Sequence, residues 1–189
     1  MSATETVLCL RSCAANMTSY GGFVWPREGH VAAPDWDPVP RCGGGLHGLL
    51  WGEGDGGYVD WSEDAVWVVF EADAATVVDL GGKVKVPAAT VLMAGERVVV
   101  AAWLSERAKG HAVVSGTATA GFGGTATAGD SGTATAGVEG CVAICRWNGK
   151  RYRWTLGEIG ETPDASGTPL VAGKPYRLDS EGRFVRADQ

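Results

Sequence analysis

The sequence predicts a mainly β fold of the α+β class, with an α+β N-terminal domain, a short octapeptide β-solenoid and C-terminal β-hairpins. Three observations lead to this fold class. An eight-residue repeat alternates threonine and alanine, residues 65–71 form a strand pattern that is apolar on both faces, and the tail carries hairpin signals. A chain of 189 residues that is 45% hydrophobic can bury a core, which excludes a wholly disordered protein.

The front of the chain mixes strand patterns with one helix pattern. Residues 65–71 are β-branched, aromatic and apolar on both faces, so we expect this strand in the centre of a sheet. Residues 96–108 repeat apolar side chains at helical spacing before Gly110, which is typical of a helix end. Four further short strands are expected at residues 6–10, 22–25, 76–80 and 83–86, the last two joined by a turn at Gly81-Gly82.

The strongest pattern is a repeat of period eight at residues 116–123, 124–131 and 132–139, each octad beginning GTATAG. Self-similarity at a fixed period indicates stacked structural units. The alternation of Thr and Ala predicts one strand per octad, and the glycines predict a corner, so that two octads make one coil.

A capping octad at residues 140–147 indicates which side of the repeat strands is buried. It carries Val142 and Ile144 where the repeats carry alanine, so we expect the alanines inside. The outward side chains are then Thr117, Thr119, Thr125, Thr127, Thr133 and Thr135. A water-ordering face needs many such rungs, and three octads split over two sides give at most two rungs per side. We therefore interpret these threonines as ordinary exposed strand residues.

The tail after the octads is predicted to be β-rich. Asn148-Gly149 lies between two strand patterns and is a strong hairpin signal. A second hairpin is expected between residues 176–178 and residues 183–185. The domain boundaries that follow are an α+β domain rich in Trp and Gly at residues 1–110, a short β-solenoid at residues 111–147 and a β-hairpin tail at residues 148–189.

Charge and cysteine content limit the partners and the location. Residues 1–104 hold 13 acidic and 6 basic residues, a net charge of −7, which disfavours nucleic-acid binding by the front half. Five cysteines, an odd number, fit reduced thiols better than disulfides. The N-terminus lacks a basic start and a long apolar stretch, so we predict a cytoplasmic protein that does not contact a membrane. No metal site and no cofactor are expected.

The order of motifs resembles that of a known family. A front domain with Cys42-Gly-Gly-Gly-Leu-His47, then GTATAG octads, then a short β tail is similar to a family of uncharacterised proteins from bacteria and their phages, often actinobacterial. The octads also resemble half of the sixteen-residue repeat of bacterial ice-nucleation proteins, including its Thr-x-Thr. The resemblance implies an architecture, and the distribution of the family would fit a phage-derived protein that binds a host factor.

The glycine-rich motif at residues 42–48 is the main candidate for a catalytic site. Glycines allow the backbone to approach a ligand, and Cys42 or His47 has the chemistry of a nucleophile, base or metal ligand. Some ADP-ribosyltransferases place a similar element before an apolar strand, which makes a transferase-like enzyme with His47 and Glu71 an alternative. The competing interpretation is a loop that enters a strand, with His47 packed.

Two further segments are candidates for binding. Trp51, Glu53, Asp55 and Tyr58 combine aromatic rings with carboxylates, as in a pocket for a carbohydrate, cation or other small ligand. The basic and aromatic hairpin at residues 146–154 is a candidate for nucleic-acid binding, although a solvated basic face over an aromatic core face explains it without a ligand. We favour a non-catalytic interaction or structural protein whose partner is another protein or a second copy of itself.

Overall fold

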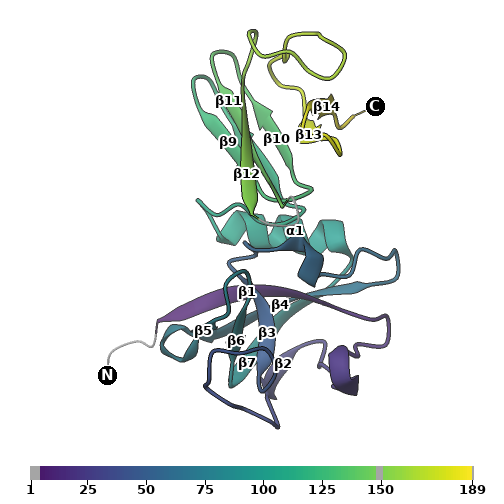
Figure 1. Cartoon of the computed structure of the whole chain (residues 1–189), viewed down its shortest axis with the longest axis vertical. Coiled ribbons are helices and arrows are strands. Elements are labelled where there is room, and N and C mark those ends of the chain that lie inside the picture. Colours follow the sequence, from purple (N-terminus) through teal and green to yellow (C-terminus); the bar gives the residue numbers. More distant parts are fainter. Residues whose placement is uncertain (1–4, 148–150, 189) are drawn as a thin grey trace. The chain divides into compact units, whose positions relative to one another are not determined.

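The computed structural model describes residues 5–147 and 151–188 and is mainly β, as predicted, with one α-helix among the described residues (Figure 1). The chain separates into two compact units, Met1–Leu104 and Ser105–Gln189. Among the described residues, no helix has the length and apolar character needed to cross a membrane.

The first unit is built on a seven-stranded sheet in the order β2-β7-β4-β1-β3-β6-β5. Its strands are β1 Thr6–Cys13, β2 Gly29–Ala32, β3 Leu46–Leu50, β4 Val66–Asp73, β5 Val78–Asp79, β6 Val84–Val86 and β7 Ala88–Gly95. All of the pairings in this sheet are antiparallel. The helix α1, Arg97–Arg107, follows the last of these strands.

The strand predicted to be central is central. β4 pairs with β1 on one side and with β7 on the other. Its residues Val66 to Phe70 are all buried, whichever face of the sheet they point to. Other parts of the unit therefore cover both faces of β4. The core on one face includes Trp25, which packs against Phe70 with ring centroids 5.2 Å apart.

Other predictions for this unit are met in part. The hairpin at Gly81-Gly82 is confirmed as β5 paired with β6, although both strands are shorter than expected. The helix is confirmed within one residue of its expected ends. The predicted strand at residues 22–25 is wrong, because this segment makes only an isolated bridge between Thr18 and Val24.

The second unit contains two sheets that run through the repeats. Their strands are β8 Thr117–Ala120, β9 Thr125–Ala128, β10 Thr133–Ala136, β11 Cys141–Trp147, β12 Tyr152–Glu158, β13 Tyr176–Leu178 and β14 Phe184–Arg186. β8 pairs in parallel with β10, Thr117 beside Thr133, and β9 pairs in parallel with β11, Thr125 beside Cys141. Each partner lies sixteen residues further along the chain, so two octads form one level, as predicted. We call these four strands the ladder.

Alanine faces the inside of the ladder, as predicted. Ala134 and Ala136 are 0% exposed, and Val142 and Ile144 extend the same buried row in the capping octad. The tail completes this core with larger side chains, which are Leu170, Tyr176 and Phe184.

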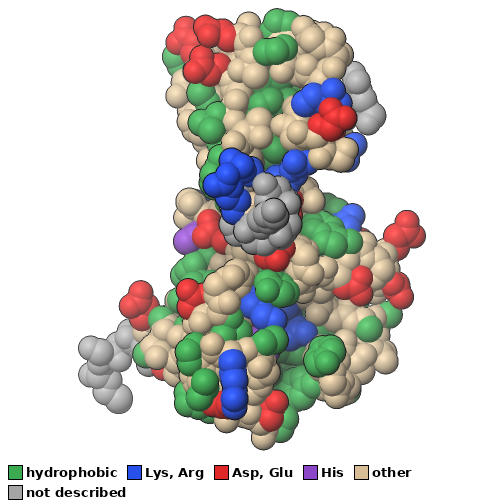
Figure 2. Space-filling view, viewed as in Figure 1, with side chains coloured by type: hydrophobic (Ala, Val, Ile, Leu, Met, Phe, Trp, Pro, Cys, Tyr) green, Lys and Arg blue, Asp and Glu red, His purple; other side chains and the backbone are tan. Residues whose placement is uncertain are grey.

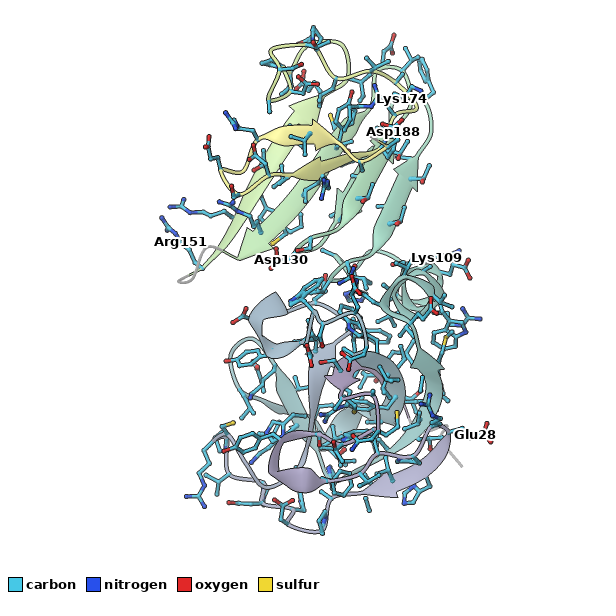
Figure 3. The ribbon with its side chains drawn as sticks, turned by 90° about the vertical axis from the view of Figure 1, so that its right-hand side faces the viewer. Glu28, Lys109, Asp130, Arg151, Lys174 and Asp188 are labelled. Atoms are coloured by element: carbon cyan, nitrogen blue, oxygen red, sulfur yellow. The ribbon has the colours of Figure 1, made fainter. Side chains whose placement is uncertain are left out.

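The tail strands continue the two sheets of the ladder. β12 pairs antiparallel with β11, and β13 pairs antiparallel with β10, while β14 pairs with β13. The corner that contains Asp130 and the beginning of β12 near Arg151 lie at one end of the strands, and Lys174 and Asp188 lie at the other (Figure 3). The Asn148-Gly149 turn predicted between β11 and β12 lies outside the described residues.

The corners use glycine for a different reason from the one expected. Backbone freedom was expected at the first glycine of each octad. The left-handed conformation does recur every eight residues, but it falls on the preceding residues Ser115, Gly123, Ser131 and Glu139, with φ between 57° and 64°. The octad glycines that follow Ser131 and Glu139 are needed because backbones approach closely there. A Cβ at Gly132 would lie 2.8 Å from the carbonyl oxygen of Gly116, sixteen residues earlier.

Gly132→Ala is therefore expected to destabilise the second unit by about 1–3 kcal/mol, because the new methyl group collides with backbone that cannot move aside easily. Gly121→Ala is the matched control, since a Cβ at Gly121 meets nothing within 4 Å. Urea unfolding of the full chain measures both. Equal stability of the two variants would contradict the close approach at the corners.

Candidate functional site

The glycine-rich motif forms a loop that is held from beneath by a buried lysine. We call residues 41–45 the glycine loop. Lys85 on β6 is 0% exposed, and its Nζ donates to the carbonyl oxygens of Arg41 and Gly43, both at 3.0 Å. A buried ammonium needs such acceptors, because leaving it unpaired costs several kcal/mol. Lys85 therefore fixes the path of the glycine loop.

A second lysine joins this loop to the acidic and aromatic segment that sequence analysis treated separately. The Nζ of Lys83 lies 3.3 Å from the Cys42 sulfur and 4.3 Å from the centre of the Tyr58 ring. Asp55 reaches the same turn, because its backbone N–H donates to the carbonyl oxygen of Gly82 at 3.2 Å. Two of the four predicted ligand-binding residues, Asp55 and Tyr58, thus adjoin the turn at Gly82 and Lys83, and Lys83 contacts the glycine loop.

His47 lies on the same face of the sheet as these lysines. It follows the glycine loop on β3 and is paired with Lys85 of β6. Burial, followed by the positive charge of Lys83, lowers the pKa of His47. The side chain is half-buried, and its Nε2 is buried with no hydrogen-bond partner among the described residues. The loop therefore enters a strand on which His47 is half-buried.

The structure does not bring His47 and Glu71 together. Leu10 on β1 pairs with Leu49 on β3 and with Val69 on β4. His47 comes two residues before Leu49, and Glu71 comes two residues after Val69. The two residues therefore lie on opposite sides of this row, on strands separated by β1. The two positions are therefore about 13 Å apart along the strands alone. Glu71 instead accepts a hydrogen bond from Thr6 Oγ1 at 2.8 Å. This geometry gives no support to a transferase centre that uses both residues.

The other two predicted ligand-binding residues lie directly after β3. Trp51 follows β3 in a left-handed conformation and packs against the hydrophobic core of the sheet. Glu53 is half-buried in the turn that comes next, where its N–H donates to the carbonyl oxygen of Leu50. Both residues thus take part in the turn by which the chain leaves β3.

Lys83, Lys85 and Arg11 were not predicted from the sequence. Arg11 on β1 is half-buried over the Trp25 ring, 4.3 Å from its centre, and donates to the carbonyl oxygen of His47 at 3.2 Å. Burial lowers the pKa of its guanidinium. The available signal was the Lys-Val-Lys pattern of residues 83–85, whose period of two places both lysines on one face of a strand.

In the second unit the predicted threonines point outward in rows. Thr117 and Thr119 on β8 are exposed and lie beside Thr133 and Thr135 on β10. On the opposite sheet only β9 carries such a pair, Thr125 and Thr127, because β11 carries other residues at the matching positions. The outward pairs are therefore two rungs deep on one side and one rung deep on the other.

The basic hairpin does not present a basic face to water and an aromatic face to the core, which the sequence favoured. Trp154 of β12 is 50% exposed and lies beside Cys145, on the face opposite the buried Ile144. Arg153 is exposed as well, and Arg146 is used to hold the turn at Asp179 and Ser180 through their carbonyl oxygens. The prediction that Trp154 belongs to a core face is wrong.

Comparison with known proteins gives relatives for about half of the chain. It is 42% identical over 95 residues to an ice nucleation protein of Xanthomonas campestris pv. translucens and 41% identical over 95 residues to ice nucleation protein InaU of Pantoea ananas. It is 37% identical over 105 residues to an ice nucleation protein of Pseudomonas syringae. These stretches are 49%, 49% and 54% of this chain, but 6%, 9% and 9% of the relatives. The chain thus spans less than a tenth of their length.

The similarity extends beyond the repeats, because the aligned stretches are longer than residues 116–139, which hold the three octads. The resemblance of the octads to ice-nucleation repeats is therefore supported. No family model and no solved structure matches the chain, so the resemblance to an uncharacterised bacterial and phage family stays a prediction.

The comparisons correct the predicted location. The relatives that match about half of the chain are ice nucleation proteins, which contradicts the prediction of a cytoplasmic protein. They also leave the prediction of no membrane contact without support. The sequence argument rested on the absence of an N-terminal signal pattern, which says nothing about anchoring by other means.

The lowered pKa of His47 predicts a pH dependence of stability. A histidine whose pKa is lower in the folded state makes the unfolded chain bind more protons, so its contribution is complete above about pH 6.5 and is lost as the pH falls from there toward the folded-state pKa. The free energy of unfolding, measured by urea titration at several pH values, should fall in this window. His47→Gln should remove this part of the decrease, and His30→Gln, at an exposed histidine, should leave it. An identical pH dependence of all three proteins would contradict the prediction.

Proposed function

We propose that this chain is a non-catalytic, repeat-based structural protein whose ladder presents threonine to water and assembles with further copies of the chain. The observation that carries the proposal is the strict sidedness of the octads, with buried alanine and outward threonine in a sixteen-residue register. Relatives named as ice nucleation proteins, aligned over about half of the chain, support a structural role for the repeats.

The three predicted segments have distinct roles in this proposal. Residues 111–147 form the solenoid-like ladder, residues 148–189 close one end of it, and residues 1–110 act as a head that binds a partner. The strand order supports this role of the tail, because β12 and β13 occupy the outer edges of β11 and β10. β8 and β9 are the edge strands at the opposite end and line a cavity of about 300 Å³ with residues 105–113.

Exposed apolar side chains on the ladder are the surface we assign to self-association. Phe122 is 74% exposed and Val138 is 57% exposed. They lie in corners that stack on each other, since the N–H of Gly123 donates to the carbonyl oxygen of Val138 at 3.0 Å. A pair of exposed apolar residues on neighbouring levels favours contact with another apolar surface. A second copy offers the same pair, as a two-fold interface requires.

Replacing Phe122 and Val138 by serine is therefore expected to shift the chain toward monomer by lowering the apolar area that association buries. Analytical ultracentrifugation over a concentration series measures the shift. Leu92→Ser is the control, because Leu92 is 42% exposed on β7 of the first unit. Assembly that is unchanged in the double variant, or a chain that is monomeric throughout, would overturn the proposed interface.

Ordering of water is a second candidate function, favoured by the block of Thr117, Thr119, Thr133 and Thr135. Hydroxyl and methyl groups recur there at the spacing of neighbouring strands, about 4.8 Å. The block is only two rungs deep, so we propose that it acts on ice after assembly has placed several blocks side by side.

Thr119→Lys is expected to lower the freezing temperature of droplets that contain the assembled protein, because a long charged side chain interrupts the threonine rows. Thr90→Lys adds the same charge at an exposed position in the first unit and should freeze like the unchanged chain. Droplet freezing at equal assembled mass measures both. Equal freezing temperatures for the two variants would count against the threonine block.

A further inference from the structure

Half of the basic residues of the first unit gather at the glycine loop. This acidic unit has six of them, which are Arg11, Arg27, Arg41, Lys83, Lys85 and Arg97. Arg41 is part of the loop, and Lys85 and Lys83 contact residues 41–43. Arg11 binds the His47 carbonyl from the opposite face of the sheet. Figure 2 shows a group of Lys and Arg side chains in the middle of the visible face of this unit. Like charges repel, so such a cluster favours a negative partner.

The neighbouring carboxylates do not supply that partner. Asp37 is paired with Arg41 at 2.9 Å and also accepts from the N–H of Val39. Asp55 accepts from the N–H of Gly57 at 2.8 Å. In the part of the chain that the structure describes, no carboxylate lies within 4.0 Å of the side-chain nitrogens of Lys83, Lys85 or Arg11.

The backbone of the glycine loop adds donors to this positive region. The N–H groups of residues 42–45 donate to no other described residue. Gly43, Gly44 and Gly45 have φ values of 95°, 57° and 150°, which only glycine adopts without strain. Carbonyl oxygens of the loop are taken by Lys85 and by the N–H of Asp37. Successive N–H groups in such turns form concave sites that bind anions.

We propose that the glycine loop, together with Lys83, binds the phosphate group of a small molecule. A phosphate has several acceptor oxygens and accommodates both the loop N–H groups and one ammonium group. Lys83 is the side chain that reaches the ligand, since it is half-buried and lies beside the loop against the Tyr58 ring and the Cys42 sulfur. Lys85 is a positioning residue that acts through the loop carbonyls and does not touch the ligand.

The neutral state of His47 fits this arrangement. Its Nε2 is an unpaired buried acceptor, and Lys83, Arg11 and Lys85 all disfavour its protonation. A bound dianion nearby would offset these positive charges. Binding should therefore raise the pKa of His47, which is a readout that a purely structural cluster would not give.

The test uses the full chain with inorganic phosphate as the probe and pyrophosphate as the second arm, followed by amide proton–nitrogen NMR at low ionic strength. We expect saturable shifts of the Gly43, Gly44 and Gly45 amide signals, with tighter binding of pyrophosphate if the natural ligand carries a diphosphate. Lys83→Ala should weaken binding by about tenfold or more, from the loss of one charge-assisted contact. Arg27→Ala removes the same charge elsewhere in the unit and should leave binding unchanged.

The same titration decides against the proposal in three cases. Shifts that are absent, that do not saturate, or that chloride at equal ionic strength reproduces would show general screening and overturn it. Equal weakening by Lys83→Ala and Arg27→Ala would overturn it as well, because net charge alone would then account for the effect. The titration of the unchanged chain remains decisive if the Lys83 variant does not fold.

Discussion

The close approach of successive backbones at the corners is the constraint on which the second unit depends. A side chain at Gly132 has no room, because the carbonyl oxygen of Gly116 lies in its place. That same oxygen accepts the N–H of Thr133 at 2.9 Å, so the corner contact and the first bond of the sheet are made by one atom. The arrangement recurs at Gly140 over Gly124. The register of both sheets therefore follows from the glycine spacing.

Such tight corners leave a narrow interior, and this explains both the alanines and the tail. Methyl groups fill a thin space between two sheets but bury little apolar area per residue. The larger side chains Leu170, Tyr176 and Phe184 supply what the alanines do not, and they come from the tail. Gly157 of β12 shows how closely the tail fits, since a Cβ there would lie 2.6 Å from Leu170. The tail is thus part of the ladder core rather than an appendage.

A structural feature could be predicted from the sequence where the contacts that determine it join residues close together in the chain. Strand, sidedness and period of the octads follow from neighbouring residues, and so does the hairpin at Gly81-Gly82. β2 and β7 were not predicted, because glycine and alanine weaken their strand patterns and distant partners define them. β3 was expected only as the strand that the glycine-rich motif enters. Trp154 was assigned to the wrong face because a period of two fixes which residues share a face and not which face is buried.

The candidate site in the first unit shows the same limit for function. The motifs at residues 42–48 and 51–58 were each recognised, but no sequence signal joins them. Lys83 and Lys85 connect the two motifs. They lie on either side of Val84 and share a face of the strand because side chains along a strand alternate. A fully buried lysine is costly, and an apolar side chain of similar size would avoid that cost. Two loop carbonyl oxygens and the Trp36 ring compensate the charge of Lys85. The contribution of Lys85 is therefore to fix the shape of the glycine loop. The chemistry of that loop then rests on its free N–H groups and on the charge of Lys83 beside them.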